Sequence, residues 1–418
     1  MIKIHLTIGI LVSVLSLSFL TSCEDKKKTE KENFIKENVE FATAQTTKML
    51  EEIGEPTGDN YPRSTNKEGK TGVTGMYDWT PGFFPGSLWY LYELTGEDTW
   101  KDAAQKWTES LEPLKTYTGN HDLGFMMYCS YGNAERLAPK PEYKDILIES
   151  AESLSTRYRD NVKSIKSWDG GRSWGDTTRW TFPVIIDNMM NLEMLFYASK
   201  VSGNKKYYDI AVNHAETTIK NQFREDFGTY HVINYDSITG EVISKATAQG
   251  FSDNSVWSRG QAWAIYGYTM VYRETKDQKF LDTAIKAAEL YIKNLPEDLV
   301  PVWDFNVGQE GYIPGERSYA VEFQEKLKDA SAGAIVCSAL FELAEYANNP
   351  SYTDIAIKML KSLASPSYRA KLGENGDFII MHCVGSIPHK SEMDRPLVYA
   401  DYYFLEALVR YKNLKEKG

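Results

Sequence analysis

One short pattern, which returns five times along this chain, constrains its fold more than any other feature of the sequence. Each copy has an aromatic residue, an Asp two positions later and an Ala or Leu four positions after the aromatic residue. In a helix the first and last of these lie on one face, where a neighbouring helix can pack, and the Asp suits the positive end of the helix dipole. The copies are Trp100-Asp102-Ala104, Tyr143-Asp145-Leu147, Tyr207-Asp209-Ala211, Phe280-Asp282-Ala284 and Tyr352-Asp354-Ala356.

Most copies follow a turn, which predicts that one helix ends shortly before the next one begins. The turns are Leu94-Thr95-Gly96-Glu97, Val201-Ser202-Gly203-Asn204 and Asn348-Asn349-Pro350. The separations between copies are close to multiples of a two-helix unit of roughly 30 to 40 residues, which is typical of helical hairpins arranged in a ring or a solenoid. Further helical periodicity occurs over Asn191 to Lys200, Lys279 to Asn294, Ser331 to Ala347 and Tyr402 to Leu414, and no alternating strand pattern persists.

The last predicted helix favours a closed ring over an open solenoid. An open solenoid needs a polar capping repeat, but residues 402–408 are rich in apolar and aromatic groups. About 385 residues at about 32 for each helix with its loop give about twelve helices. We therefore predict an all-α, single-domain (α/α)6 barrel over residues 36–418, because no Pro/Ser-rich linker divides the chain.

The N-terminus has the pattern of an export signal. Lys3 precedes an apolar run from Ile8 to Leu20, which is short for a transmembrane helix. The following Leu20-Thr21-Ser22-Cys23 resembles a bacterial lipobox. We expect residues 1–22 to be a signal peptide, Cys23 to be lipidated, and residues 23–35 to form a charged tether. The expected location is that of an exported lipoprotein, periplasmic and in contact with a membrane only through its lipid. The alternative is an ordinary cleaved signal in which Cys23 is incidental.

Charge and cysteine content exclude several classes of protein. The 58 acidic and 47 basic residues give a net charge of −11, which argues against binding a nucleic acid over a wide surface. An anionic ligand would have to meet locally placed cations or helix N-termini. Cys129, Cys337 and Cys383 are odd in number and far apart, so we expect small buried thiols and no disulfide framework. None has a His at ligand spacing, and we predict neither a structural metal nor a cofactor.

Two acidic residues lie outside the repeated pattern. Asp187 interrupts the apolar stretch Val184-Ile185-Ile186-Asp187-Asn188-Met189-Met190, interpreted as the beginning of a helix. Burial there, with a second carboxylate nearby, would raise its pKa and suit it to general acid catalysis. The alternative is a buried Asp satisfied by helix N–H groups. Asp122 lies in the polar turn Gly119-Asn120-His121-Asp122-Leu123-Gly124-Phe125, where it could equally be a helix N-cap.

A third cluster, around residue 260, combines a cation with aromatic and amide groups. Arg259 and Trp263 lie within Asp253–Trp263, and Gly260, Ala264 and Gly267 keep one helix face small. Arg can bind a carboxylate through two hydrogen bonds, and Trp can stack on a sugar ring. His231, Thr247 and Gln249 precede this segment and could add hydrogen bonds. Together these residues predict a pocket for an acidic sugar.

At these positions the sequence strongly resembles the unsaturated glucuronyl hydrolases, glycoside hydrolase family 88, from about residue 36 to 414. The resemblance implies an (α/α)6 barrel, with Asp187 as catalytic acid and base and Asp122 as a second essential carboxylate. It also implies that His231, Thr247, Gln249, Arg259, Trp263 and Trp79 line the uronate subsite. Five stretches carry the resemblance: Asp78–Gly86, His121–Phe125, Ile186–Asn191, Ser258–Trp263 and Tyr399–Leu408. Where many relatives read His-Ser, this chain has His382-Cys383, which affects any inference about the neighbouring sugar subsite.

The resemblance also implies a substrate and a reaction. The substrates are oligosaccharides cut by a polysaccharide lyase, which leaves a 4,5-unsaturated uronic acid at the non-reducing end. Protonation at C4 and addition of water at C5 would give an unstable hemiketal whose ring opens and releases the next sugar. Two alternatives remain: an unsaturated rhamnogalacturonyl hydrolase acting on pectin fragments, and a lipoprotein that binds glycans without catalysis.

Overall fold

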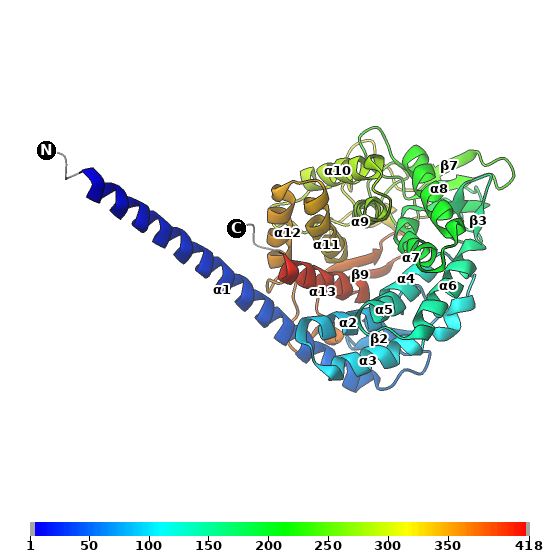
Figure 1. Cartoon of the computed structure of the whole chain (residues 1–418). Helices are drawn as coiled ribbons and strands as arrows, with labels where there is room; N and C mark the ends of the chain where they lie inside the picture. Colours follow the sequence, from blue (N-terminus) through cyan, green and yellow to red (C-terminus); the bar gives the residue numbers. More distant parts are fainter. Residues whose placement is uncertain (1–4, 415–418) are drawn as a thin grey trace.

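The computed structural model describes residues 5–414, with side chains from residue 28 onward, and shows a closed ring of paired helices (Figure 1). Six inner helical positions contact one another in sequence, and α13 completes the ring by contacting both α11 and α2. The predicted all-α barrel is therefore confirmed. The inner helices are α2 (Phe83–Thr95), α4 (Leu123–Met127) continued through a π-helical turn into α5 (Asn133–Leu137), α7 (Leu192–Ser202), α9 (Ser258–Thr275), α11 (Ala330–Tyr346) and α13 (Val398–Asn413).

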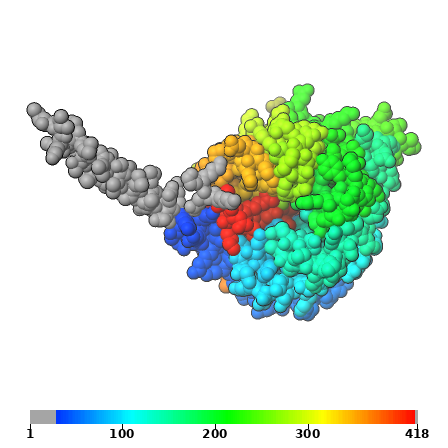
Figure 2. Space-filling model, viewed as in Figure 1, coloured from blue at the N-terminus to red at the C-terminus, as the bar shows by residue number. Residues whose placement is uncertain are grey.

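The outer helices contact the ring from outside and are amphipathic, whereas α9, α11 and α13 are buried over most of their length. In the space-filling view the chain's colours follow one another round the body, and the red C-terminal helix lies beside the blue N-terminal segment (Figure 2). The outer helices are α1 (His5–Ile53), α3 (Asp98–Glu109), α6 (Pro141–Ser155), α8 (Lys205–Gln222), α10 (Gln278–Lys293) and α12 (Pro350–Leu363).

All five copies of the repeated pattern begin outer helices. In each copy the aromatic residue is the third residue of its helix, and it is buried together with the Ala or Leu that follows. The five Asp residues are exposed, as expected for charges placed at helix starts. The turns before them have the predicted form, because Gly96 and Gly203 end the preceding inner helices with left-handed φ values of 75° and 73°.

The part of the chain expected to be a tether lies within α1. Lys31 Nζ donates to the carbonyl of Leu414 at 2.9 Å, and Phe34 contacts the ring of Tyr411, so α1 joins the barrel from about residue 31. The side chain of Cys23 lies outside the described residues. Within the part that the structure describes, no helix is long and apolar enough to cross a membrane.

Within residues 5–414, four small antiparallel sheets, which the sequence did not predict, lie in the loops between helices. One of them carries site residues. In it β5 (Phe182–Ile185) pairs with β6 (Val232–Tyr235), and β6 pairs with β7 (Val242–Ala246). The other strands are β1 (Tyr61–Thr65) with β2 (Thr71–Thr74), β3 (Tyr158–Arg159) with β4 (Ser164–Ile165), and β8 (Cys383–Ser386) with β9 (Ser391–Arg395).

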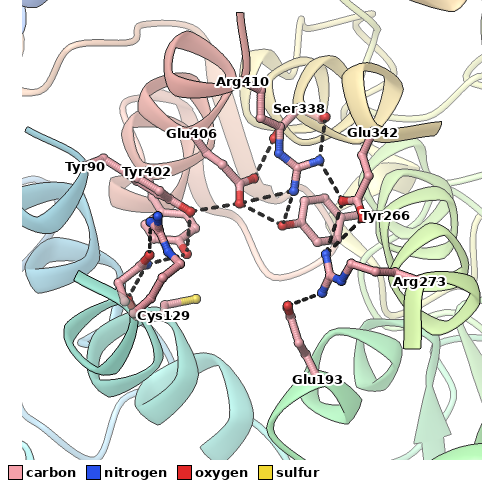
Figure 3. A network of polar contacts seen from close by, with 12 residues as sticks. Tyr90, Cys129, Glu193, Tyr266, Arg273, Ser338, Glu342, Tyr402, Glu406 and Arg410 are labelled. Carbon is pink, nitrogen blue, oxygen red and sulfur yellow. Dashed lines mark hydrogen bonds and ion pairs between the residues drawn. The ribbon is translucent and has the colours of Figure 1, made fainter. Parts of the chain in front are cut away.

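The carboxyl-terminal halves of the inner helices are joined by buried charges and hydroxyls (Figure 3). Glu406, on α13, accepts hydrogen bonds from the hydroxyls of Tyr90 and Tyr266 at 2.8 Å each and from Ser338 at 2.5 Å. Arg410 pairs with Glu342 at 2.9 Å and approaches Glu406 at 3.5 Å. This network connects α2, α9, α11 and α13 across the barrel.

Candidate active site

The residues that open the inner helices gather at one end of the barrel. Trp79 precedes α2, Asp122 precedes α4, Asp187 precedes α7 and Arg259 is the second residue of α9. They line one cavity of about 630 Å³ together with Gln249. Its lining residues are Trp79, Asp122, Trp168, Gly171, Arg172, Ser173, Trp174, Trp180, Ile185, Asp187, Ala248, Gln249, Arg259, Arg317 and His389.

The sheet β5–β6–β7 places Asp187 beside His231. Asp187 is not at the start of an α-helix, as the sequence suggested, but is the second residue of the 3-10 helix η3 (Ile186–Asn191), directly after β5. The sheet register sets Ile185 opposite Val232, and the Ile186 N–H donates to the His231 carbonyl at 3.0 Å. Asp187 and His231 therefore leave the same end of the sheet.

The small face predicted for α9 packs against η3. A side chain at Gly267 would lie 2.5 Å from Met189, and one at Gly260 would lie 3.1 Å from Ile186. Close approach of α9 is thus possible only because these positions lack a Cβ. This packing holds Arg259, at the start of α9, on the same side of the barrel as Asp187.

Asp187 Oδ2 lies 3.5 Å from Nε2 of His231. The other ring nitrogen, Nδ1, accepts hydrogen bonds from the backbone N–H groups of Ala248 at 3.0 Å and Gln249 at 3.1 Å. Since Nδ1 is an acceptor, the ring hydrogen is on Nε2, which lies near Asp187 but makes no hydrogen bond to it within the described residues. The turn after β7 therefore sets both the orientation and the tautomer of His231.

Asp122 is coupled to Asp187 through their charges. Burial raises the pKa of Asp122 well above its ordinary value, and the nearby carboxylates of Asp187 and Asp78 raise it further, whereas Arg157 lowers it. Two interacting carboxyl groups in one cavity titrate as a pair. Such a pair can retain one proton near neutral pH, which a general acid requires. That Asp187 is the residue that carries this proton stays a prediction.

The guanidinium of Arg259 is bound by other groups of the protein. It is 1% exposed, and its Nη1 donates to Asp329 Oδ2 at 2.9 Å and to the carbonyl of Val384. Its Nη2 donates to the carbonyl of Gly385 at 2.6 Å. The buried Asp329 balances its charge, and the rings of Trp257 and Tyr399 lie 4.6 and 5.4 Å from the guanidinium carbon. The guanidinium is therefore fixed in position.

Three of the predicted residues are not among those that line the cavity. Trp263 is fully buried between the rings of Phe125 and Tyr403, so its indole belongs to the core. Thr247 Oγ1 accepts from the Gly250 N–H at 2.7 Å and shapes the turn that presents Gln249. His231 acts on the cavity through its contact with Asp187.

Sequence reasoning missed the loop between β4 and β5, which contributes three indoles to the cavity. Trp168 and Trp180 stack with their ring centres 6.1 Å apart, and Trp174 Nε1 donates to the Ala248 carbonyl at 2.9 Å. Arg172, Arg317 and His389 add cations or a potential cation to the lining. The density of Trp and Gly in residues 168–180 was a signal that could have identified this loop.

None of the described cysteines is among the residues that line the cavity. Cys129, Cys337 and Cys383 are free and buried, as expected. Cys383 begins β8, where it pairs with Arg395 of β9. Within the described side chains, no group of three or more His, Cys, Asp or Glu residues could hold a metal ion.

Comparisons with known proteins identify the family to which this chain belongs. The family model described as Glycosyl Hydrolase Family 88 matches residues 56–414. An unsaturated glucuronyl hydrolase of Formosa agariphila is 47% identical over 97% of this chain and 98% of its own length. An unsaturated chondroitin disaccharide hydrolase of Streptococcus pyogenes is 30% identical over 84% of this chain and 86% of its own. The crystal structure of an unsaturated glucuronyl hydrolase specific for heparin has a TM-score of 0.83 and 42% identity, covering 91% of this chain and 97% of that one.

Proposed function

Because this chain belongs to glycosyl hydrolase family 88 and is therefore a glycosidase, we propose that it removes a 4,5-unsaturated uronic acid from the non-reducing end of lyase-cut glycosaminoglycan fragments. The relative from Formosa agariphila, which is 47% identical over nearly the whole chain, supports this activity. The single structural observation that carries the proposal is the pair Asp122 and Asp187 in one Trp-lined cavity.

The proposed reaction begins at the double bond of the substrate. Asp187 donates a proton to C4, and positive charge develops at C5 and on the ring oxygen. Water adds to C5 while giving a proton to the same carboxylate, which restores the protonated Asp187. The resulting hemiketal opens, and the bond to the next sugar is released. Since hydration starts the reaction, the separation of the two carboxylates does not predict a retaining or an inverting outcome.

Asp122 has a different part in this proposal. Its ionised carboxylate would accept hydrogen bonds from ring hydroxyls of the substrate, and its charge would help Asp187 to keep its proton. The electrostatic coupling between the two residues supports a pair that holds one proton, and the assignment of that proton to Asp187 is part of the proposal. An attack by Asp122 on the sugar is not required.

Arg259 would bind the carboxylate of the unsaturated uronate. Its three hydrogen bonds inside the protein use both Nη1 donors and one Nη2 donor. Among the residues that the structure describes, this leaves Nε–H and one Nη2–H without a protein partner. We propose that this fork of two donors binds the two oxygens of the substrate carboxylate.

We further propose that heparin-type disaccharides are preferred over chondroitin-type ones. The structure specific for heparin is 42% identical to this chain, whereas the three chondroitin relatives are 29% or 30% identical. Initial rates on unsaturated disaccharides from heparin, chondroitin and hyaluronan, each with and without sulfate, measure this preference. Higher rates on chondroitin disaccharides would contradict it.

The loss of ultraviolet absorbance by the conjugated double bond provides the assay for the activity itself. The parent protein should consume an unsaturated disaccharide, and Asp187→Asn should not, since an amide cannot donate and recover the proton. A parent protein without activity on any of these disaccharides would refute the proposed function. An Asp187→Asn variant as fast as the parent would refute the proposed acid.

We also propose that Cys23 anchors the protein to a membrane of its bacterial cell after export. Labelling with a radioactive fatty acid in cells should mark the parent protein and not Cys23→Ser. The parent protein should also fractionate with membranes. Labelling of the variant, or its absence from the parent, would contradict the proposal.

A further inference from the structure

Arg63, on β1, binds two acidic residues that come from distant parts of the chain. Its Nη1 pairs with Asp78, and its Nε and Nη2 donate to the two carboxylate oxygens of Glu392 at 2.5 and 3.3 Å. The three side chains are 17% to 28% exposed, so water weakens their attraction less than at an open surface. None of the three is among the residues that line the cavity. Each acid, however, holds a segment that does contribute to the cavity.

Asp78 fixes the turn that carries Trp79. Its Oδ1 accepts hydrogen bonds from the backbone N–H of Thr80 at 3.0 Å and from the Thr80 hydroxyl at 2.6 Å, while its Oδ2 pairs with Arg63. Trp79 stands between Asp78 and Thr80 in the sequence and lines the cavity, with its ring centre 5.0 Å from that of Tyr399. Arg63 therefore determines where the Asp78 carboxylate lies, and with it the start of this turn.

Glu392 connects Arg63 to the hairpin β8–β9. Its φ of 50° is left-handed, a conformation that residues with a Cβ seldom adopt, so contacts outside the strand have to hold it. Its carboxylate lies over Gly385, where a Cβ would overlap it. The Gly385 carbonyl in turn accepts from Arg259 Nη2 at 2.6 Å and from Gln249 Nε2 at 3.2 Å. Glu392 thus links Arg63 to two residues that line the cavity.

From these contacts we propose that Arg63 is a positioning residue that holds the Trp79 turn and the β8–β9 hairpin together and thereby sets the distance between two walls of the uronate subsite. The inference rests on the proposed function, in which Arg259 binds the uronate carboxylate. A guanidinium suits this task, because its donors lie on different edges of one rigid plane and can bind two carboxylates at a fixed angle. The ammonium group of Lys cannot fix both carboxylates in this way.

Arg395 offers a matched comparison between the same two hairpins. It also joins β9 to the β1–β2 hairpin, since its Nη1 donates to the Thr65 hydroxyl at 3.0 Å and to the Asn66 carbonyl at 3.3 Å. Neither Arg395 nor these two partners line the cavity. Removing Arg395 therefore loosens the same contact between the hairpins without releasing Asp78, so any general effect of a weaker contact should appear in variants of both arginines.

The experiment compares Arg63→Met, Arg63→Lys and the control Arg395→Met with the parent protein. KM and kcat on an unsaturated disaccharide are measured by the absorbance assay, and stability is measured by unfolding in urea. Burial, Asp187 and Asp78 raise the pKa of Asp122, so the rates are compared at the pH optimum of each variant.

In Arg63→Met we expect KM to rise about tenfold, the equivalent of losing one well-placed contact, with kcat within about threefold of the parent. The effect on kcat is smaller because Asp122 and Asp187 lie on other elements. Arg63→Lys should fold like the parent, because it keeps a charge between the two acids, and should raise KM about threefold. Arg395→Met should leave KM within about twofold. A residue that only stabilises the fold would lower the unfolding midpoint in both Met variants without this difference in KM.

Fluorine-labelled tryptophan provides a readout that needs no turnover. In protein that contains 5-fluorotryptophan, the ¹⁹F resonance of Trp79 is identified by its absence from Trp79→Phe. This resonance should shift in Arg63→Met and in Arg63→Lys, and it should stay in place in Arg395→Met. A parent protein that is inactive on every disaccharide refutes the proposed function, but the spectrum still tests whether Arg63 positions Trp79. An unmoved Trp79 resonance in a folded Arg63 variant would overturn the inference, as would equal KM values for the two Met variants.

Discussion

Replacement of Glu406 by Gln tests whether the network in Figure 3 stabilises the barrel without taking part in the chemistry. Glu406 is 7% exposed and accepts hydrogen bonds from Tyr90, Tyr266 and Ser338. Burial, followed by the charge of Glu406, raises the pKa of both tyrosines, so both hydroxyls keep their hydrogens and donate. Gln retains the shape of Glu and removes the charge.

The cost follows from the change in each hydrogen bond. A hydrogen bond to a charged group contributes about 1.5–3 kcal/mol, and one between neutral groups about 0.5–1.5 kcal/mol. The Gln amide has one oxygen, so the bonds from Tyr90 and Tyr266 to the position of Oε1 lose their charge, and the bond from Ser338 to the position of Oε2 is lost because an NH₂ group stands there. Together these changes should lower the free energy of unfolding by about 4 kcal/mol. Arg410 keeps its partner Glu342, so the larger penalty of an unpaired buried charge, about 3–5 kcal/mol, is not added.

Equilibrium unfolding in urea measures this difference, and the absorbance assay measures activity. We expect kcat/KM to stay within about twofold of the parent, because Glu406 and its partners lie at and beyond the midpoints of their helices, whereas the cavity lies at the helix starts. Glu345→Gln, an exposed charge on the same helix as Ser338, is the control and should change the stability by less than about 0.5 kcal/mol. Equal unfolding midpoints for Glu406→Gln and the parent would refute the reasoning, as would a large loss of activity with unchanged stability.

Three further perturbations have expected outcomes. Arg259→Lys keeps a charge beside Asp329 but loses the fork, so KM should rise about tenfold with kcat less affected, and an unchanged KM would remove the clamp role. Trp168→Leu should raise KM about threefold to tenfold by removing a sugar-stacking surface, as measured by initial rates at several substrate concentrations. Burial raises the pKa of Asp401 from 3.8 to about 7, so its contribution to the free energy of unfolding is present below pH 3.8 and is lost as the pH rises to about 7. Urea unfolding between pH 4 and pH 8 should show this decline in the parent and not in Asp401→Asn.

The ring of helices could be predicted because its signal is local and repeated. Each aromatic residue of the pattern needs only the residue four positions later to define a buried face, and the five exposed Asp residues explain why the acid recurs without a catalytic role. Closure followed from the apolar residues of α13, which contact α2 at the other end of the chain. These inferences depend on residues that lie within one turn of a helix.

The sheet β5–β6–β7 could not be predicted in the same way. β5 has four residues, all buried, so it has no alternation of exposed and buried positions to distinguish it from the beginning of a helix. Its pairing partner β6 lies about 50 residues further along the chain. The sequence therefore identified Asp187 as a buried acid but did not identify the strand that brings it to His231.

The hydrogen-bond partners of the site residues could not be predicted either, because they lie far away along the chain. Arg259 is 70 residues from Asp329 and 126 from Gly385. Without these contacts the sequence could identify an arginine but not which of its N–H groups stay free for a ligand. Trp263 shows that nearness in sequence can also mislead. It lies four residues from Arg259 on the same helix and was therefore expected in the cavity, but its indole packs in the aromatic core.

The arrangement of the two helix layers explains how a chain with a net charge of −11 can bind an anionic sugar. The outer helices begin with exposed acids, which place much of the negative charge on the outside. The inner helices begin at the cavity, since Trp79, Asp122, Asp187 and Arg259 stand at or near the starts of four of them and all line it. The positive ends of these helix dipoles therefore converge on the place where the substrate carboxylate would lie. The same field stabilises both aspartates as anions, which opposes the proton that the reaction needs, so the burial and mutual repulsion of Asp122 and Asp187 are required to retain it.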